Sequence, residues 1–216
     1  MNYKTIDMDS FPRRAHFEYF KGLAYPYVGF TVNVDITGFL AQQKRLGLPF
    51  YLALAYCVTR AANSVPEFRR RIHGDGIIEY DWCHGSHTVA LPDDTYCYCT
   101  LDCRMPFDEY LPRAAEAWER AKAASSIEDG EDADSLLFFS SIPWMSFTSV
   151  IQPTPSPADS NPRITWGRYF RQDGKVLLPL AVLCNHALVD GLHISRFYSA
   201  LDRELAELTD RLGDMG

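Results

Sequence analysis

The segment Asn185-His186-Ala187-Leu188-Val189-Asp190-Gly191 joins an apolar run, Val176 to Cys184, to a predicted helix from about Leu192 to Leu212. An apolar strand that leads into an amphipathic helix is typical of a mixed α/β fold. Two interpretations of the polar pair at this corner stay open: a functional site, or a histidine satisfied by backbone hydrogen bonds beside an ordinary turn. The helix itself is predicted from an apolar stripe at helical spacing, formed by Phe197, Leu201, Leu205, Leu208 and Leu212.

The chain on either side of this segment alternates between strand and helix patterns. Apolar residues at every second position predict a strand over Val28 to Ile36. A helical pattern follows to about Leu46, and Phe50 to Val65 is apolar nearly all round, which predicts a buried helix. With no repeat and no break in composition, we expect one mixed α/β domain over residues 1–216. The remaining expected elements are strands at 77–80, 87–91, 95–101, 163–170 and 175–184, one strand within 136–151, and a helix at about 107–125.

Two loops interrupt this pattern. The dipeptide Asp173-Gly174 between two strand-like stretches is a strong hairpin signal. Prolines at positions 153, 155, 157 and 162 predict a loop without regular structure. The acidic run Glu128 to Asp132 is expected to be a solvated connection rather than a metal site.

Composition limits the classes of function. The chain has 216 residues, 47% of them apolar, and a formal net charge of −7, which argues against nucleic acid or an anionic membrane as the main partner. The first residues lack the apolar stretch of a signal peptide. The longest apolar runs have nine residues, whereas a helix needs about 20 to cross a bilayer. We therefore expect a cytoplasmic protein.

Several common catalytic motifs are absent from the sequence, among them GxxxxGK[ST], GxGxxG, GxSxG and HExxH. Structural zinc sites have paired, tightly spaced ligands, and the sequence contains no CxxC pair. We therefore favour buried, inert cysteines over a metal centre, and expect no metal. The residues weighed for such a centre are Cys83, His84, His87, Cys97, Cys99 and Cys103.

The motif His-x-x-x-Asp-Gly after an apolar strand resembles the signature of chloramphenicol acetyltransferases, and it also occurs in dihydrolipoyl acyltransferases and condensation domains. Four further stretches are similar to the chloramphenicol acetyltransferase family itself, in order and over nearly the whole chain. They are Phe11 to Phe20; Asp35-Ile36-Thr37 with Phe50-Tyr51; Pro143 to Ser149, which is similar to a Pro-Trp-x-x-Phe-x-Ser motif; and Ile164 to Tyr169.

The resemblance implies an α/β fold (α+β, two-layer) with a mixed sheet flanked by helices. It also implies a homotrimer with its active sites between subunits, and acetyl-CoA as cosubstrate. The implied activity is acetyl transfer to a hydroxyl of a small acceptor, chloramphenicol by resemblance, which would confer antibiotic resistance. Two alternatives stay open: an acyltransferase of the same family with a different acceptor, or a catalytically silent relative that binds a small molecule.

The resemblance also assigns roles to individual residues. His186 matches the family's catalytic base, and an imidazole that is neutral at about pH 7 can remove a hydroxyl proton. Ser149 matches the residue that stabilises the oxyanion, and Thr165 one that holds a water near the transition state. Asp190 and Arg13 match a structural ion pair.

Departures from the family pattern are concentrated at the expected acceptor end. Asn185 stands where the family has the first histidine of a pair, and Phe20 where antibiotic-modifying members have a tyrosine. Ala24 and Val28 stand where larger apolar residues line the acceptor pocket, and Tyr96 is expected there too. Pro49 replaces a lysine often found near CoA. Arg168 and Tyr169 are expected at the CoA site.

Overall fold

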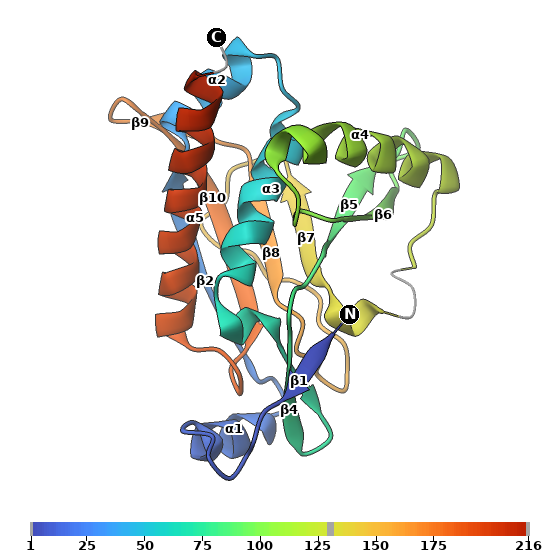
Figure 1. Ribbon diagram of the computed structural model, residues 1–216, viewed down its shortest axis with the longest axis vertical. Helices are drawn as coiled ribbons and strands as arrows, with labels where there is room; N and C mark the ends of the chain where they lie inside the picture. The colour runs from blue at the N-terminus through green and yellow to red at the C-terminus, as the bar shows by residue number, and fades with distance from the viewer. Residues whose placement is uncertain (1, 129–131, 215–216) are drawn as a thin grey trace.

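The computed structural model describes residues 2–128 and 132–214 and contains two β-sheets (Figure 1). The larger sheet is mixed and has the strand order β2-β10-β8-β7-β5-β6, with β9 pairing β10 beyond the end of β8. In this sheet the β5–β7 and β7–β8 pairs are parallel, and the other pairs among the described residues are antiparallel. Its strands are β2 (Tyr27–Asp35), β5 (Gly85–Ala90), β6 (Tyr96–Leu101), β7 (Leu137–Ile142), β8 (Arg163–Gly167), β9 (Phe170–Gln172) and β10 (Lys175–Asn185).

Helices lie on one face of the large sheet, and a small sheet lies at one end of the molecule, next to α1 (Figure 1). Helices α3 and α5 run side by side across this face, and α4 packs against β6. The helices are α1 (Arg14–Lys21), α2 (Thr37–Arg45), α3 (Phe50–Asn63), α4 (Phe107–Ala124) and α5 (Gly191–Gly213). The small sheet has the order β1-β4-β3 and consists of β1 (Tyr3–Thr5), β3 (Arg70–His73) and β4 (Gly76–Tyr80).

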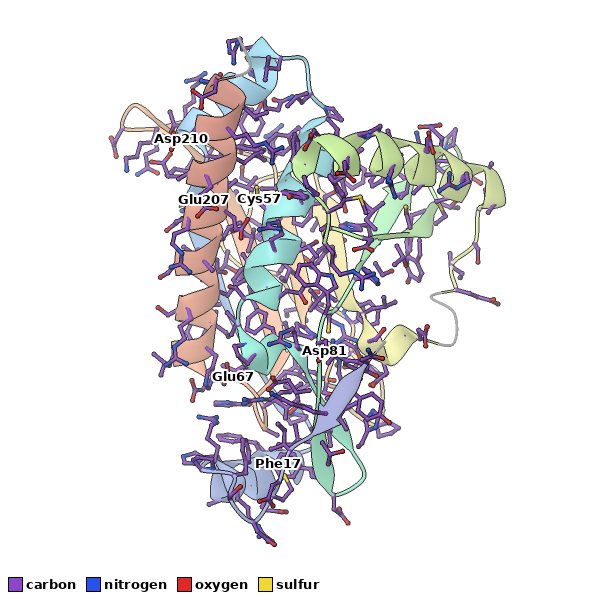
Figure 2. All side chains as sticks on the ribbon, viewed as in Figure 1. Phe17, Cys57, Glu67, Asp81, Glu207 and Asp210 are labelled. Carbon is purple, nitrogen blue, oxygen red and sulfur yellow. The ribbon has the colours of Figure 1, made fainter. Side chains whose placement is uncertain are left out.

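The helix α5 buries the stripe that the sequence predicts. All five apolar residues of the stripe are at most 5% exposed. On the other side of the helix, Glu207 and Asp210 are exposed (Figure 2). Helix α3 packs against α5 and is buried from Leu52 to Thr59, as expected for a helix that is apolar nearly all round. The side chain of Cys57 lies at this helix–helix contact, 3.6 Å from the carbonyl oxygen of Glu204 (Figure 2).

The strand expected over 163–170 is interrupted. Residues 163–167 form β8, which pairs with β10 around Ala181, whereas β9 pairs with the first residues of β10 across the Asp173-Gly174 turn. Arg168 and Tyr169 lie between the two strands, because the backbone N–H of Arg168 donates to Met145 outside the sheet, at 2.8 Å. The hairpin is therefore confirmed, but it joins β9 to β10.

Helix α1 and the strands β1 and β3 were not predicted from the sequence. Strand β1 has three residues and β3 has four, which is too short for a clear period-2 pattern. Of the acidic run Glu128 to Asp132, residues 129–131 lie outside the described residues.

Helices pack against one face of the large sheet, and the orientation of single residues shows which side chains lie on the other face. Cys184 of β10 lies near Tyr198 of α5, so it faces the helices. Side chains alternate along a strand, so Ala181 faces the opposite side. Thr165 is paired with Ala181 and shares that side. The face that carries Thr165 is therefore the one away from the helices.

Candidate active site

His186 lies directly after β10, in a turn that ends where α5 begins. Its backbone N–H donates to the carbonyl of Pro26 at 2.7 Å, which fixes the turn against the start of β2. The ring atom Nδ1 lies 2.8 Å from the carbonyl oxygen of Val189. A carbonyl only accepts hydrogen bonds, so Nδ1 carries the proton and Nε2 keeps its lone pair. No hydrogen bond to Nε2 is found within the part of the chain that the structure describes.

The imidazole of His186 stacks on the ring of Phe20, with centroids 3.8 Å apart and ring planes inclined by 23°. Phe20 was expected in the acceptor pocket, and the structure places it against the histidine ring itself. Ala24 is exposed in the segment between α1 and β2. Val28 is half-buried in β2, opposite Cys184.

Asp190 joins the N-terminal segment to the start of α5. Arg13 Nη1 donates to Asp190 Oδ2. The other carboxylate oxygen accepts the backbone N–H of Leu192 at 3.0 Å and so caps the helix. His193 completes a capping box, because its Nδ1 accepts the backbone N–H of Asp190 at 3.0 Å. Burial raises the pKa of Asp190, but His193 and Arg13 outweigh this and hold that pKa below its usual range.

A cavity of about 810 Å³ lies on the face of the sheet away from the helices. Thr165 lines it, is only 2% exposed, and its Oγ1 makes no hydrogen bond to any residue in 2–128 or 132–214. This hydroxyl can therefore bond to a ligand or a water in the cavity. Tyr96, expected in the acceptor pocket, also lines the cavity. Other lining residues are Thr88, Tyr98, Phe138, Ser140, Trp144 and Ile151.

Ser149 lies in the irregular segment between β7 and β8, and its side chain is exposed. The next two residues, Val150 and Ile151, line the cavity. Ser149 is therefore on the same side of the molecule as Thr165 and Tyr96, and it is not in a strand.

Within one chain, the predicted site residues form two separate groups. The residues that line the cavity do not include His186. Thr165 is paired with Ala181, four residues before the end of β10 at Asn185. At a rise of about 3.3 Å per residue, roughly 13 Å of strand separates Thr165 from the start of the His186 turn. His186 and Phe20 thus form one group, and Thr165, Tyr96 and Ser149 belong to another.

The residues expected at the CoA site lie at the break between β8 and β9. Arg168 is exposed, and its carbonyl accepts the hydroxyl of Ser146 at 2.5 Å. The ring of Tyr169 packs against Phe50, with centroids 5.8 Å apart. Lys44 Nζ lies 5.8 Å from the centroid of the Tyr169 ring. Lys44 therefore lies over the ring of this tyrosine, and the exposed Arg168 precedes it in the chain.

The cysteines are buried and free, all six of them. Burial raises the pKa of the Cys99 thiol to about 11 and that of Cys103 to about 12, so both stay protonated. In the described residues, no group of three or more His, Cys, Asp or Glu side chains is placed to hold a metal ion. No helix within residues 2–128 and 132–214 combines the length and the apolar character that a membrane crossing requires.

Sequence reasoning missed one polar residue close to His186. Asp159 lies at the end of the proline-rich loop, where no regular structure was expected. Its carboxylate accepts two hydrogen bonds from Arg163 and one from Tyr27, and its carbonyl accepts one from Asn185. An Asp159–Arg163 pair at the spacing i, i+4 was the only signal available, and outside a helix that spacing does not predict a contact.

Solved structures with a similar fold include acetyltransferases. A structure described as a chloramphenicol acetyltransferase superposes with a TM-score of 0.87 at 24% identity, covering 94% of this chain and 100% of the other. A probable dihydrolipoamide acetyltransferase from Listeria monocytogenes superposes with a TM-score of 0.66 at 16% identity, covering 94% of each chain. The expected mixed sheet flanked by helices is thus confirmed, and the fold is one that acetyltransferases share.

Sequence comparison identifies the family within this class. A family model described as chloramphenicol acetyltransferase matches residues 1–202. A chloramphenicol acetyltransferase from Clostridium perfringens is 32% identical over 223 aligned positions, covering 99% of this chain and 100% of the relative. One from Streptomyces acrimycini is 31% identical over 206, covering 94% of each. The chain belongs to the chloramphenicol acetyltransferase family, which confirms the prediction of an acyltransferase.

Proposed function

We propose that this protein transfers the acetyl group of acetyl-CoA to a hydroxyl of a small acceptor, with His186 as the general base. The observation that carries the proposal is the bond from Nδ1 of His186 to the carbonyl of Val189, at 2.8 Å. It fixes the tautomer in which Nε2 can accept a proton. General-base assistance of this kind contributes roughly 10²–10⁴-fold to a rate.

The reaction proceeds by direct attack. Nε2 of His186 takes the proton of the acceptor hydroxyl while the oxygen attacks the thioester carbonyl. Ser149 donates to the oxyanion of the tetrahedral intermediate, a contribution of roughly 10²–10³-fold. The Thr165 hydroxyl, buried and without a protein partner among the described residues, holds a water or the acceptor near that centre. CoA leaves as the thiol, protonated by the imidazolium.

Acetyl-CoA would be held near Arg168 and Tyr169. Support comes from the exposed guanidinium of Arg168 and from Lys44, which lies over the Tyr169 ring. Two cations beside an exposed strand break suit the phosphates of CoA. The expected cytoplasmic location and a role in antibiotic resistance remain part of this proposal.

The complete site would form between two copies of the chain, with His186 from one and Ser149, Thr165 and Tyr96 from the next. The separation of these groups within one chain supports this arrangement. So do exposed apolar side chains beside each group, since large exposed apolar surface marks interaction sites. Tyr19, Leu23, Tyr25 and Phe30 are exposed near the His186 side, and Tyr96, Trp144, Met145 and Ile151 near the cavity. A closed ring of three copies would give three such sites.

A release assay for the CoA thiol, run with acetyl-CoA and a panel of hydroxylated acceptors including chloramphenicol, tests the activity. Thiol release with any acceptor supports the proposal. If the panel produces no thiol while small molecules still bind, the protein is a silent binding relative and the proposal is wrong.

Co-expression of two inactive variants tests the shared site. His186→Ala and Ser149→Ala should each lack activity alone, whereas mixed oligomers should regain it, because some interfaces then join an intact His186 to an intact Ser149. If mixed oligomers form and stay inactive, both residues act within one chain.

One observation favours a different acceptor from that of the antibiotic-modifying relatives. Phe20 contacts the base but has no hydroxyl with which to bond a substrate. Arg163, a cation, lines the cavity together with the hydroxyls of Thr88 and Ser140. The charge of Arg163 is paired with Asp159, and the lining also includes the apolar Phe138, Trp144 and Ile151. An acceptor that needs no hydrogen bond from residue 20 therefore fits this site, and the panel above tests it.

A further inference from the structure

The last residues of the proline-rich loop, 159–163, are hydrogen-bonded to several other segments and are called the platform below. Ser160, Asn161 and Arg163 are 7%, 4% and 9% exposed. The side-chain amide of Asn161 donates to the carbonyl oxygens of Ala133 at 2.9 Å and Leu136 at 2.8 Å. The hydroxyl of Ser160 accepts the backbone N–H of Ile72 at 3.0 Å. The segment 159–163 is therefore attached to the body of the protein at several points, although it has no regular structure before Arg163.

Asp159 is the polar centre of this platform. Arg163 donates to both of its carboxylate oxygens, at 2.8 and 2.7 Å. The hydroxyl of Tyr27 donates to Oδ1 at 2.9 Å. Burial, followed by the charge of Asp159, raises the pKa of Tyr27 to about 12, so the phenol stays protonated and keeps donating. Arg163 also lines the cavity, so Asp159 is bonded to a residue of the cavity wall.

Asn185 connects this platform to the turn that carries His186. It is 3% exposed, and its amide nitrogen donates to the carbonyl oxygen of Asp159 at 2.9 Å. Its amide oxygen accepts the backbone N–H of Ala187 at 3.0 Å. Asn185 is also the strand partner of Tyr27, which holds Asp159 from the other side. One side chain therefore bonds to the platform and to the backbone just past His186.

We propose that Asn185 is a positioning residue for His186, acting through the platform at Asp159. The inference rests on the proposed function, since it gives His186 its role as base. The Nδ1 bond of His186 lies within its own turn, so it holds only while that turn keeps its shape. A misplacement of about 1 Å in a catalytic group can cost roughly 10²-fold in rate.

The first test measures the tautomer of His186 by 15N NMR of the histidine rings, which requires no substrate. The wild type should show Nδ1 protonated and Nε2 bare. Asn185→Ala should show a mixture of tautomers. Asn185→His should restore the single tautomer, because an imidazole can donate with one nitrogen and accept with the other. A single tautomer in Asn185→Ala would overturn the proposal.

The second test measures kcat for thiol release and KM for acetyl-CoA. Asn185→Ala should lose about 10²-fold in kcat with KM for acetyl-CoA unchanged, and Asn185→His should recover most of the loss. Tyr27→Phe, which removes one hydroxyl, is the milder variant if Asn185→Ala does not fold, and its kcat should fall by a smaller factor. An unchanged kcat in Tyr27→Phe and in a folded Asn185→Ala would also overturn the proposal.

Asn63→Ala is the matched control. Asn63 is 6% exposed and, like Asn185, bridges two segments through its amide, donating to Thr59 and Cys83 and accepting from Cys83. Its loss should lower the melting temperature and leave kcat and the His186 tautomer unchanged. If Asn185→Ala behaves in the same way, its role is structural and the proposal is wrong. The wild type could show the single tautomer and still be inactive toward every acceptor. That result would refute the proposed function but not the positioning role of Asn185.

Discussion

The imidazole of His186 and the ring of Phe20 lie face to face, with centroids 3.8 Å apart. The contact buries one side of the proposed base and restricts rotation of its ring. It also means that a group attached to the ring of Phe20 is close to any hydroxyl that Nε2 can reach. The identity of residue 20 therefore affects both the base and the acceptor.

Phe20→Tyr should improve chloramphenicol turnover. The added hydroxyl supplies a hydrogen bond worth about 0.5–1.5 kcal/mol, which corresponds to roughly two- to tenfold in kcat/KM. The measurement is kcat/KM over a series of chloramphenicol concentrations, with KM for acetyl-CoA as the control. A micromolar KM and rapid turnover in the wild type would contradict the premise, because the pocket would then need no such bond.

His186→Ala should lower acetyl transfer by roughly 10²–10⁴-fold, because the proton acceptor is lost. The fold should persist, since the ring makes one hydrogen bond and one stacking contact. A thiol-release assay measures the loss of activity, and circular dichroism checks that the fold persists. His16→Ala, at an exposed histidine in α1, is the matched control and should remain fully active. Retention of more than about a tenth of wild-type turnover by His186→Ala would exclude it as the base.

Two substitutions at Asp190 should separate its helix cap from its ion pair. Asp190→Ala removes both and should lower the free energy of unfolding by about 2–4 kcal/mol. Asp190→Asn keeps a capping side chain, so it should cost about 1 kcal/mol less. Urea unfolding of both variants measures the difference. Equal losses would show that the cap contributes nothing and that the Arg13 pair accounts for the whole effect.

Acid should destabilise the fold through His87. This histidine is fully buried and Tyr51 is 3.1 Å from its Nδ1; burial lowers its pKa from 6.5 to about 3. The unfolded chain therefore binds a proton below about pH 6.5 that the folded chain does not accept until about pH 3. The contribution of His87 to stability is complete well above pH 6.5. The free energy of unfolding should fall by about 2 kcal/mol between pH 7 and pH 5 from this residue alone.

The comparison that isolates this effect is urea unfolding of wild type and His87→Gln at both pH values. The variant should lose less stability on acidification. The slope of its free energy of unfolding against pH should be smaller than that of the wild type by the equivalent of about one bound proton. Identical slopes for the two proteins would mean that His87 does not remain neutral in the fold.

The protein should be active only as an oligomer. If the site forms between copies, sedimentation at the assay concentration should show a trimer, and dilution that yields monomer should abolish thiol release. An active monomer would contradict the shared site directly, whatever the residues involved.

The elements with strong periodicity could be predicted from the amino-acid pattern alone. Burial of one face imposes a regular spacing of apolar residues, so the stripe of α5 and the alternation of β2 can be read from the chain. Helix α3 is buried nearly all round and can be read from its long apolar run. The Asp173-Gly174 turn was equally visible, since few residue pairs adopt its backbone. The apolar run before Asn185 placed His186 directly after a strand, and in the structure it follows β10.

The grouping of the site residues, in contrast, follows from long-range packing. Local sequence carries no information on which strand lies beside β10, so neither the distance between Thr165 and His186 nor the stacking of Phe20 could be derived from it. Asp159 shows the same limit: its partners Tyr27 and Asn185 are distant in sequence, and a polar residue after prolines predicts only a loop. Contacts between residues far apart in the chain depend on packing of the whole sheet, and that packing brings Asn185 to Asp159.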